Sequence, residues 1–487
     1  MTLQILIDDT VRVPDDVFAL TGVSRFGDIL YRRRSLAQHL KDAAAAADLP
    51  EPQLLSGVQS MLDLQQKLSH PVPAGRYLII PTNIVAQTSK SAFAIFLRQL
   101  RYLPSNLLIS VTSGAEWSGL VLGDARIVSE YLATLSATGT PAEFARNWQG
   151  EIPELKNELN LVDLRDQASF LVFLTSNFDV RHFNAIENQN FTIVKRSTDK
   201  KKLKREYDFY SWLPAEVQTF FVQPFDFQES ADSASYRMER FFLPDMAIQW
   251  VHGAFSEAEF ERLLDRLFHY INIRPRKPVA RDAALAEMDR LYADKLSARI
   301  EQLEALPEYA DLLPFVNRAV GDLGAVVKRY QRIYQKHRAK FPANYLAIGH
   351  GDLCFSNMLY SKATQILRFI DPRGASTPDE MYFDPYYDVA KLSHSILGGY
   401  DFINSGRFDI QLDADLKMEL QTDEGDRKWA RKIFERKLRD HGFDPLLVRI
   451  CEASLFISML PLHIDIPKKV LGLLINADMI LNEIEAL

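Results

Sequence analysis

The chain has 487 residues, of which 47% are hydrophobic and 25% are charged, and its formal net charge at pH 7 is −7. A chain of this length can bury a sizeable core and allows two or three domains. The acidic balance argues against a general nucleic-acid-binding protein, which needs a basic surface to displace counterions. Because there are only two cysteines, Cys354 and Cys451, no disulfide framework is expected.

Neither a targeting segment nor a membrane span is expected. Residues 1–13 carry Asp8 and Asp9 and lack the basic segment and the following apolar segment of a signal peptide. The apolar runs fall short of the roughly 18 to 20 residues that cross a bilayer. We therefore expect a cytoplasmic protein, and the sequence leaves its oligomeric state open.

Residues 1–168 alternate apolar strands with amphipathic helices. Strands are expected at 3–7, 76–81 and 107–111, and helices at 35–48, 89–102 and 124–136. This alternation is typical of an α/β domain but indicates no role for it.

The pattern changes after residue 168. Residues 169–243 indicate a small sheet with one charged helix at 198–212, and its strands are expected at 170–174, 191–194, 220–227 and 235–241. Residues 244–487 are mainly helical. Helices are expected there at 257–271, 282–306, 314–336, 386–397, 427–441, 445–460 and 467–485, and short strands at 346–348 and 366–370.

One motif carries most of the chemical information. The run His350-Gly351-Asp352-Leu353-Cys354-Phe355-Ser356-Asn357 follows one predicted strand, and Asp371 directly follows the next. A carboxylate in the position of Asp352 can accept the proton of an attacking hydroxyl. The amide of Asn357 and the carboxylate of Asp371 supply the oxygen ligands that Mg²⁺ prefers. Together these three side chains predict phosphoryl transfer, in which metal ions neutralise the phosphates.

This motif resembles the catalytic core of the aminoglycoside phosphotransferase and choline kinase-like group, and so does the later run Asp384-Pro385-Tyr386-Tyr387-Asp388-Val389-Ala390-Lys391-Leu392. The resemblance covers residues 170–487. It implies an α+β fold class: a two-lobed protein-kinase-like fold, with a sheet lobe at 169–243 and a helical lobe at 244–487, preceded by a separate α/β domain at 1–168. It also implies ATP and Mg²⁺ as cofactors, Asp352 as catalytic base, and Asn357 and Asp371 as metal ligands. His350 and Asp388 would support the loop, although Asp388 fits equally well as an N-cap for a helix that starts at Val389.

The resemblance further implies a strand lysine that contacts the α- and β-phosphates and a helix glutamate that holds it. Lys195 and Glu206 fit these two roles. The backbone of Glu239, Arg240 and Phe241 would read the adenine edge, or would simply link the two lobes.

The acceptor is expected to be a hydroxyl of a small polar molecule, such as a sugar or a sugar-like compound. Arg373 could hold an anionic group of the substrate, or it could pair with Asp384 or Asp388 as part of the scaffold. His394, Tyr400 and Asp401 are candidates for the acceptor pocket, but a place in the core or on the surface fits each of them as well.

Two alternatives remain open. The loop at 177–184, which would cover the phosphates, contains no glycine. It therefore keeps open a pseudokinase-type module that senses nucleotide and controls the N-terminal domain. A protein kinase is the other alternative, although the short segment from Asp371 to Asp384 leaves little room for a loop that positions a peptide.

Overall fold

The computed structural model describes residues 3–68, 75–87, 90–103, 105–111, 116–156, 159–175, 184–188, 191–342, 344–413 and 417–486. The chain divides into two compact units. The first comprises residues 1–177 with 252–254, and the second comprises 178–251 with 255–487.

The first unit is built on a six-stranded mixed sheet in the order β4-β1-β5-β8-β7-β9. Strand β1 pairs in parallel with both β4 and β5, while β8 is antiparallel to its two neighbours. The strands are β1 (Leu3–Asp8), β4 (Gln53–Leu55), β5 (Arg76–Pro81), β7 (Leu107–Ser110), β8 (Gly119–Gly123) and β9 (Glu154–Lys156).

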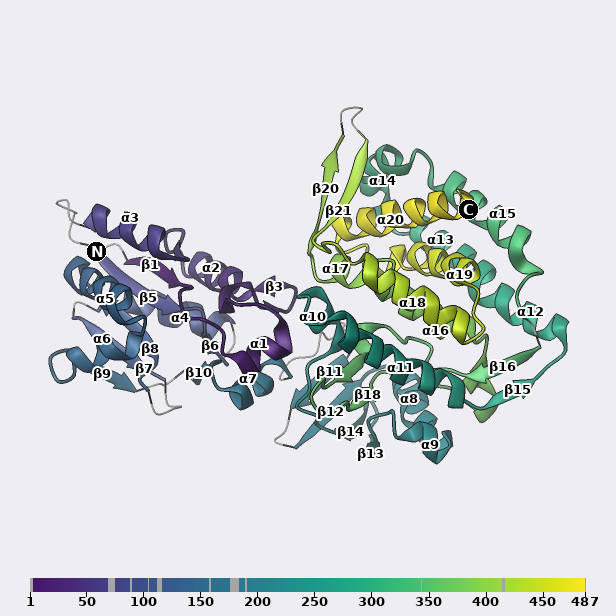
Figure 1. Ribbon diagram of the computed structural model, residues 1–487, viewed down its shortest axis with the longest axis horizontal. Coiled ribbons are helices and arrows are strands. Elements are labelled where there is room, and N and C mark those ends of the chain that lie inside the picture. Colours follow the sequence, from purple (N-terminus) through teal and green to yellow (C-terminus); the bar gives the residue numbers. More distant parts are fainter. Residues whose placement is uncertain are drawn as a thin grey trace. The chain divides into compact units, whose positions relative to one another are not determined.

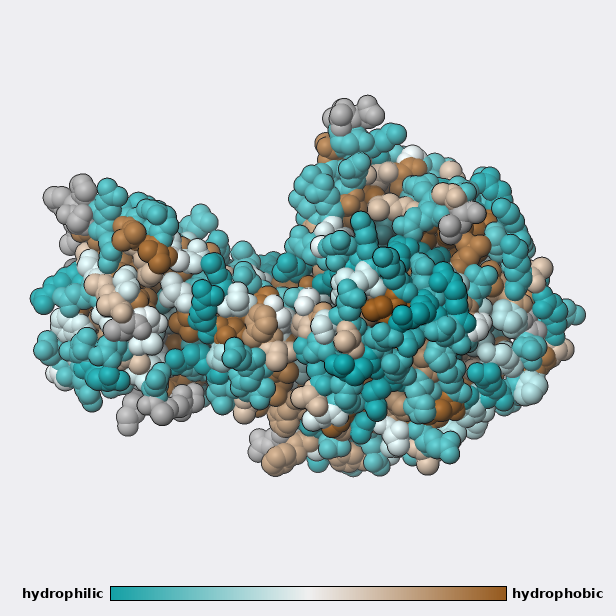
Figure 2. All heavy atoms as spheres, in the orientation of Figure 1, coloured by the Kyte–Doolittle hydropathy of each residue, from teal (hydrophilic) through white to brown (hydrophobic). Residues whose placement is uncertain are grey.

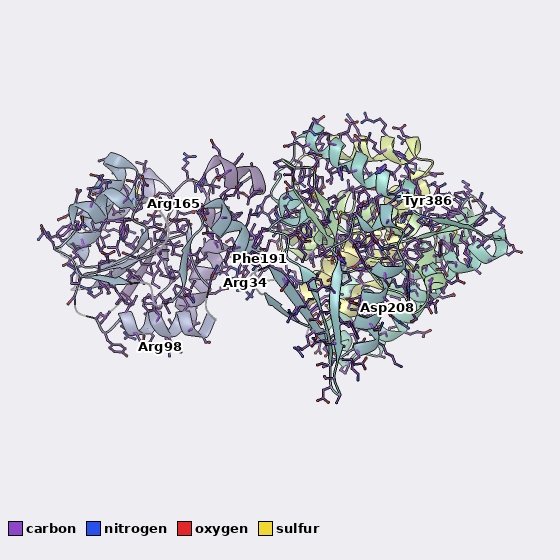
Figure 3. The ribbon with its side chains drawn as sticks, turned by 90° about the horizontal axis from the view of Figure 1, so that it is seen from below. Arg34, Arg98, Arg165, Phe191, Asp208 and Tyr386 are labelled. Atoms are coloured by element: carbon purple, nitrogen blue, oxygen red, sulfur yellow. The ribbon has the colours of Figure 1, made fainter. Side chains whose placement is uncertain are left out.

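Both faces of this sheet are covered by apolar cores. In β1, Leu3, Ile5 and Ile7 enter the core with helices α2 (Leu36–Ala46) and α4 (Lys90–Leu100). Leu6 points the other way, into the core with α3 (Val58–Leu68) and α5 (Ala125–Thr138). Side chains of a strand alternate between the two faces, so a strand covered on both sides is apolar throughout. Figure 1 shows these helices on either side of the sheet, and Figure 3 marks α4 by Arg98.

The strand predicted at 170–174 is wrong. Residues Gln167–Leu174 form helix α7, and the side chain of Asp166 caps it by accepting a hydrogen bond from the Ser169 N–H (2.8 Å). The continuous apolar run suggested a buried strand, but a short run of this kind cannot be distinguished from a buried helix by periodicity. The N-cap aspartate was the signal that decides the case.

The second unit begins with a four-stranded antiparallel sheet in the order β11-β12-β14-β13. Helix α8 (Lys200–Trp212) packs on it through Leu203, in a core that also holds Ile193 of β12 and Tyr236 of β14. Figure 3 marks these parts by Phe191, which directly precedes β12, and by Asp208 on α8. The strands are β11 (Asn184–Asn188), β12 (Thr192–Ser197), β13 (Pro224–Glu229) and β14 (Ala234–Glu239).

The rest of this unit is mainly helical (Figure 1). Where α11 and α18 lie, the surface is largely hydrophilic (Figure 2), and ion pairs such as Lys437–Asp265 (2.5 Å) join the two helices. The helices are α9 (Ala215–Gln218), α10 (Met246–Val251), α11 (Glu257–Ile273), α12 (Arg281–Asp289), α13 (Lys295–Glu304), α14 (Pro307–Val320), α15 (Leu323–Arg338), α16 (Tyr386–Ile396), α17 (Tyr400–Asn404), α18 (Lys428–Asp440), α19 (Pro445–Ser458) and α20 (Pro467–Glu485).

The single helix predicted at 314–336 is instead two helices, α14 and α15. Asp322 interrupts it, because its carboxylate caps the second helix by accepting from the N–H groups of Gly324 and Ala325 (both 3.0 Å). Helical periodicity continues across such a break, so the apolar pattern alone did not reveal it.

Short strands position the motif that carries the chemistry. Strand β16 (Tyr345–Ile348) leads into it, and the hairpin of β17 (Met358–Tyr360) and β18 (Leu367–Phe369) follows it. Strand β16 is itself fixed between β15 (Arg276–Pro278) and β19 (Tyr382–Phe383). The motif is therefore a loop between two anchored strands.

The sequence pattern did not predict the hairpin of β20 (Phe408–Leu412) and β21 (Met418–Thr422).

Within the residues that the structure describes, no helix has both the length and the apolar character needed to cross a bilayer.

Candidate active site

The loop after β16 is held by the fully buried imidazole of His350. Its Nε2 lies 3.0 Å from the carbonyl oxygen of Ile370, and its Nδ1 accepts from the Asp352 N–H (3.2 Å). These contacts define the tautomer, with the proton on Nε2. Burial lowers the pKa of His350, so the ring is neutral and acts as a brace between the loop and the end of β18.

Asp388 braces the same loop from helix α16. Its carboxylate accepts from the N–H groups of His350 and Gly351, both at 2.8 Å. On the other side it pairs with the buried guanidinium of Arg274 at 2.8 Å. Helix α16 starts at Tyr386, so Asp388 lies inside its first turn and the N-cap interpretation is wrong.

Asp352 projects from this loop, and its side chain is 45% exposed. Its Oδ2 accepts from Asn357 Nδ2 (3.0 Å), and its Oδ1 lies 2.9 Å from the Nζ of Lys391 on α16. The surrounding protein alone would raise the pKa of Asp352, but the ammonium of Lys391 dominates and lowers it. Asp352 is thus an ionised carboxylate that faces open space.

Asn357 has the orientation that a metal ligand would need. Its amide nitrogen donates to both the backbone oxygen and the carboxylate of Asp352 (2.9 and 3.0 Å), which leaves its Oδ1 as an acceptor. The backbone oxygen of Asn357 accepts from the Ile370 N–H (3.0 Å), so Asn357 lies beside the segment that carries Asp371. A carboxylate and an amide oxygen in this setting fit Mg²⁺, and bound phosphates would complete its ligands.

Asp371 follows β18 and has a left-handed backbone conformation, with φ of +56°. A non-glycine residue rarely adopts this conformation, and such strain is concentrated at functional sites. Its side chain is 46% exposed, and its Oδ1 lies 2.8 Å from Lys195 Nζ. The loop thereby directs the Asp371 carboxylate toward the sheet.

Lys195 joins Asp371 to Glu206. Its Nζ lies 2.5 Å from Glu206 Oε2, and both side chains are buried. Burial alone would lower the pKa of Lys195, but the carboxylates of Asp371 and Glu206 raise it well above its usual value. The strand expected at 191–194 stops just before Lys195, but β12 extends to Ser197, so Lys195 lies within the strand and pairs with Tyr236 of β14. Pairing inside the strand fixes the backbone of Lys195 more firmly than a position beyond the strand end would.

A close approach brings the loop after Asp371 onto α8. Gly374 has φ of +74°, and a Cβ at this position would lie 2.6 Å from the carbonyl carbon of Arg205 and 2.7 Å from the Glu206 nitrogen. Only glycine fits this position without displacing backbone. The same contact therefore holds Glu206 close to the Asp371 loop.

An apolar pocket lies next to Asp371. It is lined by residues of the sheet and of the β17–β18 hairpin, namely Ile193, Val222, Met238, Glu239, Phe241, Leu359, Ile370 and Asp371. Two of the predicted hinge residues, Glu239 and Phe241, are among them. Arg240 is not, and its backbone N–H donates to the Phe191 carbonyl (3.0 Å).

The remaining predicted residues lie as follows. Arg373 is exposed and pairs with neither Asp384 nor Asp388, because Tyr292 donates to Asp384 (2.6 Å) and Arg274 takes Asp388. His394 is fully buried and stacks on Tyr400, with ring centroids 4.1 Å apart. Asp401 is also buried. Residues 177–183 of the predicted phosphate loop lie outside the described part of the chain.

Sequence reasoning missed Lys391 and Arg274. Lys391 lies three residues after Asp388 on the same helix, and residues at this spacing share a face, so the spacing could have revealed it. Arg274 follows α11 and is more than a hundred residues away from Asp388 along the chain, so no local pattern links the two.

No protein-family model and no curated protein sequence matches the chain. Solved structures do. Aminoglycoside phosphotransferase APH(4)-Ia is 13% identical, with a TM-score of 0.39, over 64% of this chain and 96% of that chain. Spectinomycin phosphotransferase APH(9)-Ia is 10% identical, with a TM-score of 0.38, over 64% and 92%. Aminoglycoside-3'-phosphotransferase of type VIII is 16% identical, with a TM-score of 0.33, over 55% and 84%. At these identities and TM-scores, the resemblance to aminoglycoside phosphotransferases remains a prediction from the motif residues.

Proposed function

We propose that the second unit is an ATP- and Mg²⁺-dependent phosphotransferase that acts on a hydroxyl of a small polar molecule. One observation carries this proposal: Lys195, Glu206 and Asp371 form one continuous set of contacts, beside a loop on which Asp352 and Asn357 are hydrogen-bonded to each other. Phosphoryl transfer requires these groups together, because catalysis there is mainly positioning and charge stabilisation.

The lining of the apolar pocket has the chemical character that the base of a nucleotide needs. Ile193, Met238 and Leu359 offer apolar surface to a flat ring, and Glu239 and Phe241 offer backbone groups at its edge. Asp371 also lines this pocket and contacts Lys195. If the base occupies the pocket, the phosphates of the nucleotide would therefore extend toward Lys195.

Asn357 and Asp371 would hold Mg²⁺, which supplies charge neutralisation at the phosphates. The side chains of the protein would position the acceptor and take up its proton. Asp352 accepts a hydrogen bond from the acceptor hydroxyl and orients its oxygen toward the γ-phosphorus. The oxygen–phosphorus bond to the acceptor forms as the bond to the β–γ bridging oxygen breaks, ADP leaves, and the hydroxyl proton passes through Asp352 to solvent.

The acceptor that we favour is a small molecule rather than a peptide. Between Asp371 and α16 the chain forms only one turn of 3-10 helix, Pro378–Met381, and the short strand β19. This segment offers no extended platform for a peptide. A sugar or a sugar-like compound is the class that we propose.

The test is ATP consumption with Mg²⁺ across a panel of sugars, amino alcohols and peptides, using the full chain and Asp352→Asn. We expect ADP and a phosphorylated small molecule from the wild type, and a loss of about 10²- to 10⁴-fold in kcat for Asp352→Asn. ATP binding without turnover on the whole panel would favour a nucleotide-sensing module instead, and labelling of peptides alone would favour a protein kinase.

A further inference from the structure

We propose that Lys391 is a second cation of the transfer site and contacts the transferred phosphoryl group from the side of Asp352. This inference rests on the proposed function and adds to it a catalytic residue on α16.

The position of Lys391 carries the argument. Its Nζ lies 2.9 Å from Asp352 Oδ1, and its side chain is 10% exposed whereas that of Asp352 is 45% exposed. A hydroxyl that bonds to Asp352 lies within about 3.2 Å of the carboxylate. A hydroxyl bonded to Oδ1 would therefore place the reacting oxygen within roughly 6 Å of the ammonium, and the phosphoryl group must come to that oxygen.

The ammonium also has unused capacity. A lysine ammonium has three donors, and among the described residues Asp352 is the one hydrogen-bonding or ion-pair partner of the Lys391 ammonium. Retaining a desolvated cation costs free energy unless its interactions offset that cost. Two donors beside the predicted base are available to the equatorial oxygens of a transferred group.

The charges around Asp352 support a role for Lys391 beyond that of a counterion to Asp352. Asp352 already accepts from Asn357, so its orientation does not depend on Lys391 alone. A base paired with a cation is a weak one, and a loose transition state makes little demand on base strength. Such a transition state instead benefits from cations near the oxygens of the transferred group. Lys195, which contacts Asp371, and Lys391, which contacts Asp352, would supply these cations.

The test compares the affinity of the full chain, with Mg²⁺, for ADP and for ADP with aluminium fluoride, which mimics the phosphoryl group in transfer. We expect Lys391→Met to weaken binding of ADP–aluminium fluoride about 10²-fold or more while ADP binding stays within twofold. Lys391→Arg should restore part of the loss. The matched control is Lys295→Met, because Lys295 donates to Tyr387 (2.7 Å) on the same helix, and it should change neither affinity.

Asp352→Asn and Asp352→Asn/Lys391→Met separate contact with the phosphoryl group from a counterion role. If Lys391 touches the group, it contributes in the Asp352→Asn background as well; if it only neutralises Asp352, its loss there has no effect. Equal weakening of both ligands, or no change in either, would overturn the assignment. A wild type that binds ADP–aluminium fluoride no better than ADP would instead refute the proposed function itself.

Discussion

Lys195 of β12 and Asp371, which follows β18, lie 2.8 Å apart from Nζ to Oδ1 although 176 positions separate them along the chain. Glu206 holds the other side of the same ammonium at 2.5 Å. This arrangement places a cation suited to phosphate next to a carboxylate suited to a metal, through contacts between segments that only the fold brings together.

Replacing Asp371 by asparagine should remove the metal-dependent part of nucleotide binding. The variant keeps the size of the side chain but loses the anionic oxygen, so we expect the Mg²⁺-induced gain in ATP affinity to fall about 10- to 100-fold. Titration calorimetry with and without Mg²⁺ measures this gain. Asp379→Asn is the control, because Asp379 is exposed in the same loop and pairs with Lys277. An unchanged Mg²⁺ dependence in Asp371→Asn would contradict the ligand assignment.

Lys195→Met should destabilise the second unit and not only weaken ATP binding. It leaves Glu206 buried, with 4% of its side chain exposed, without its main cationic partner. Loss of one member of a buried pair costs about 3 to 5 kcal/mol. We expect a lower Tm by differential scanning calorimetry. Lys202→Met should change little, because Lys202 is 43% exposed and lies 3.9 Å from Glu206. Equal Tm values for the two variants would refute the structural role of the pair.

Gly374→Ala tests the contact between the Asp371 loop and α8. The new Cβ would lie 2.6 Å from the backbone of Arg205, so the loop must shift and carry Asp371 away from Lys195. We expect lower ATP affinity together with a loss of stability. Gly442→Ala is a matched control, since Gly442 also has positive φ (+78°) but nothing lies within 4 Å of its Cβ position. If both variants bind ATP equally well, the close approach has no part in the site.

Much of the candidate site could be predicted from the sequence, because its residues sit in local patterns. Asp352, Asn357 and Asp371 lie at the ends of short apolar runs. Lys195 and Glu206 were predicted from the family resemblance, which implies a lysine in a strand and a glutamate in the following helix. The structure brings these residues together. Arg274 could not be found, since its pairing with Asp388 depends on tertiary packing between distant segments.

The errors in the predicted fold occurred in segments where the apolar periodicity fits more than one arrangement of secondary structure. Residues 170–174 are apolar on all sides and fit a strand or a buried helix equally. Residues 314–336 keep their helical period across a break that only the cap at Asp322 reveals. In both cases a polar capping side chain carried information that the apolar pattern lacked.

Asp384 should make the stability of the protein depend on pH. Burial raises the pKa of this carboxyl to about 7, against the hydrogen bond from Tyr292. The unfolded chain has the ordinary, lower pKa, so between about pH 4 and pH 7 the folded state binds more protons at this site. Its contribution to stability is therefore greatest below that window and is lost as the pH rises through it.

Asp384→Asn should remove this contribution, because the amide oxygen can still accept from Tyr292 without carrying a charge. Calorimetric Tm values from about pH 5 to pH 8 should show a flatter profile for the variant than for the wild type. Asp409→Asn, at an exposed surface carboxylate, is the control. A profile for Asp384→Asn that parallels the wild type would show that Asp384 does not titrate in this range.

Transfer of label from γ-phosphate-labelled ATP tests the central claim most directly. The full chain is incubated with Mg²⁺ and the panel of small hydroxyl compounds, and labelled products are separated from ATP and phosphate. The site built by Asp352, Asn357, Asp371 and Lys195 predicts label on a small-molecule hydroxyl in the wild type and almost none with Asp352→Asn. Equal labelling by the wild type and Asp352→Asn, or label on no small molecule while ATP is bound, would contradict it.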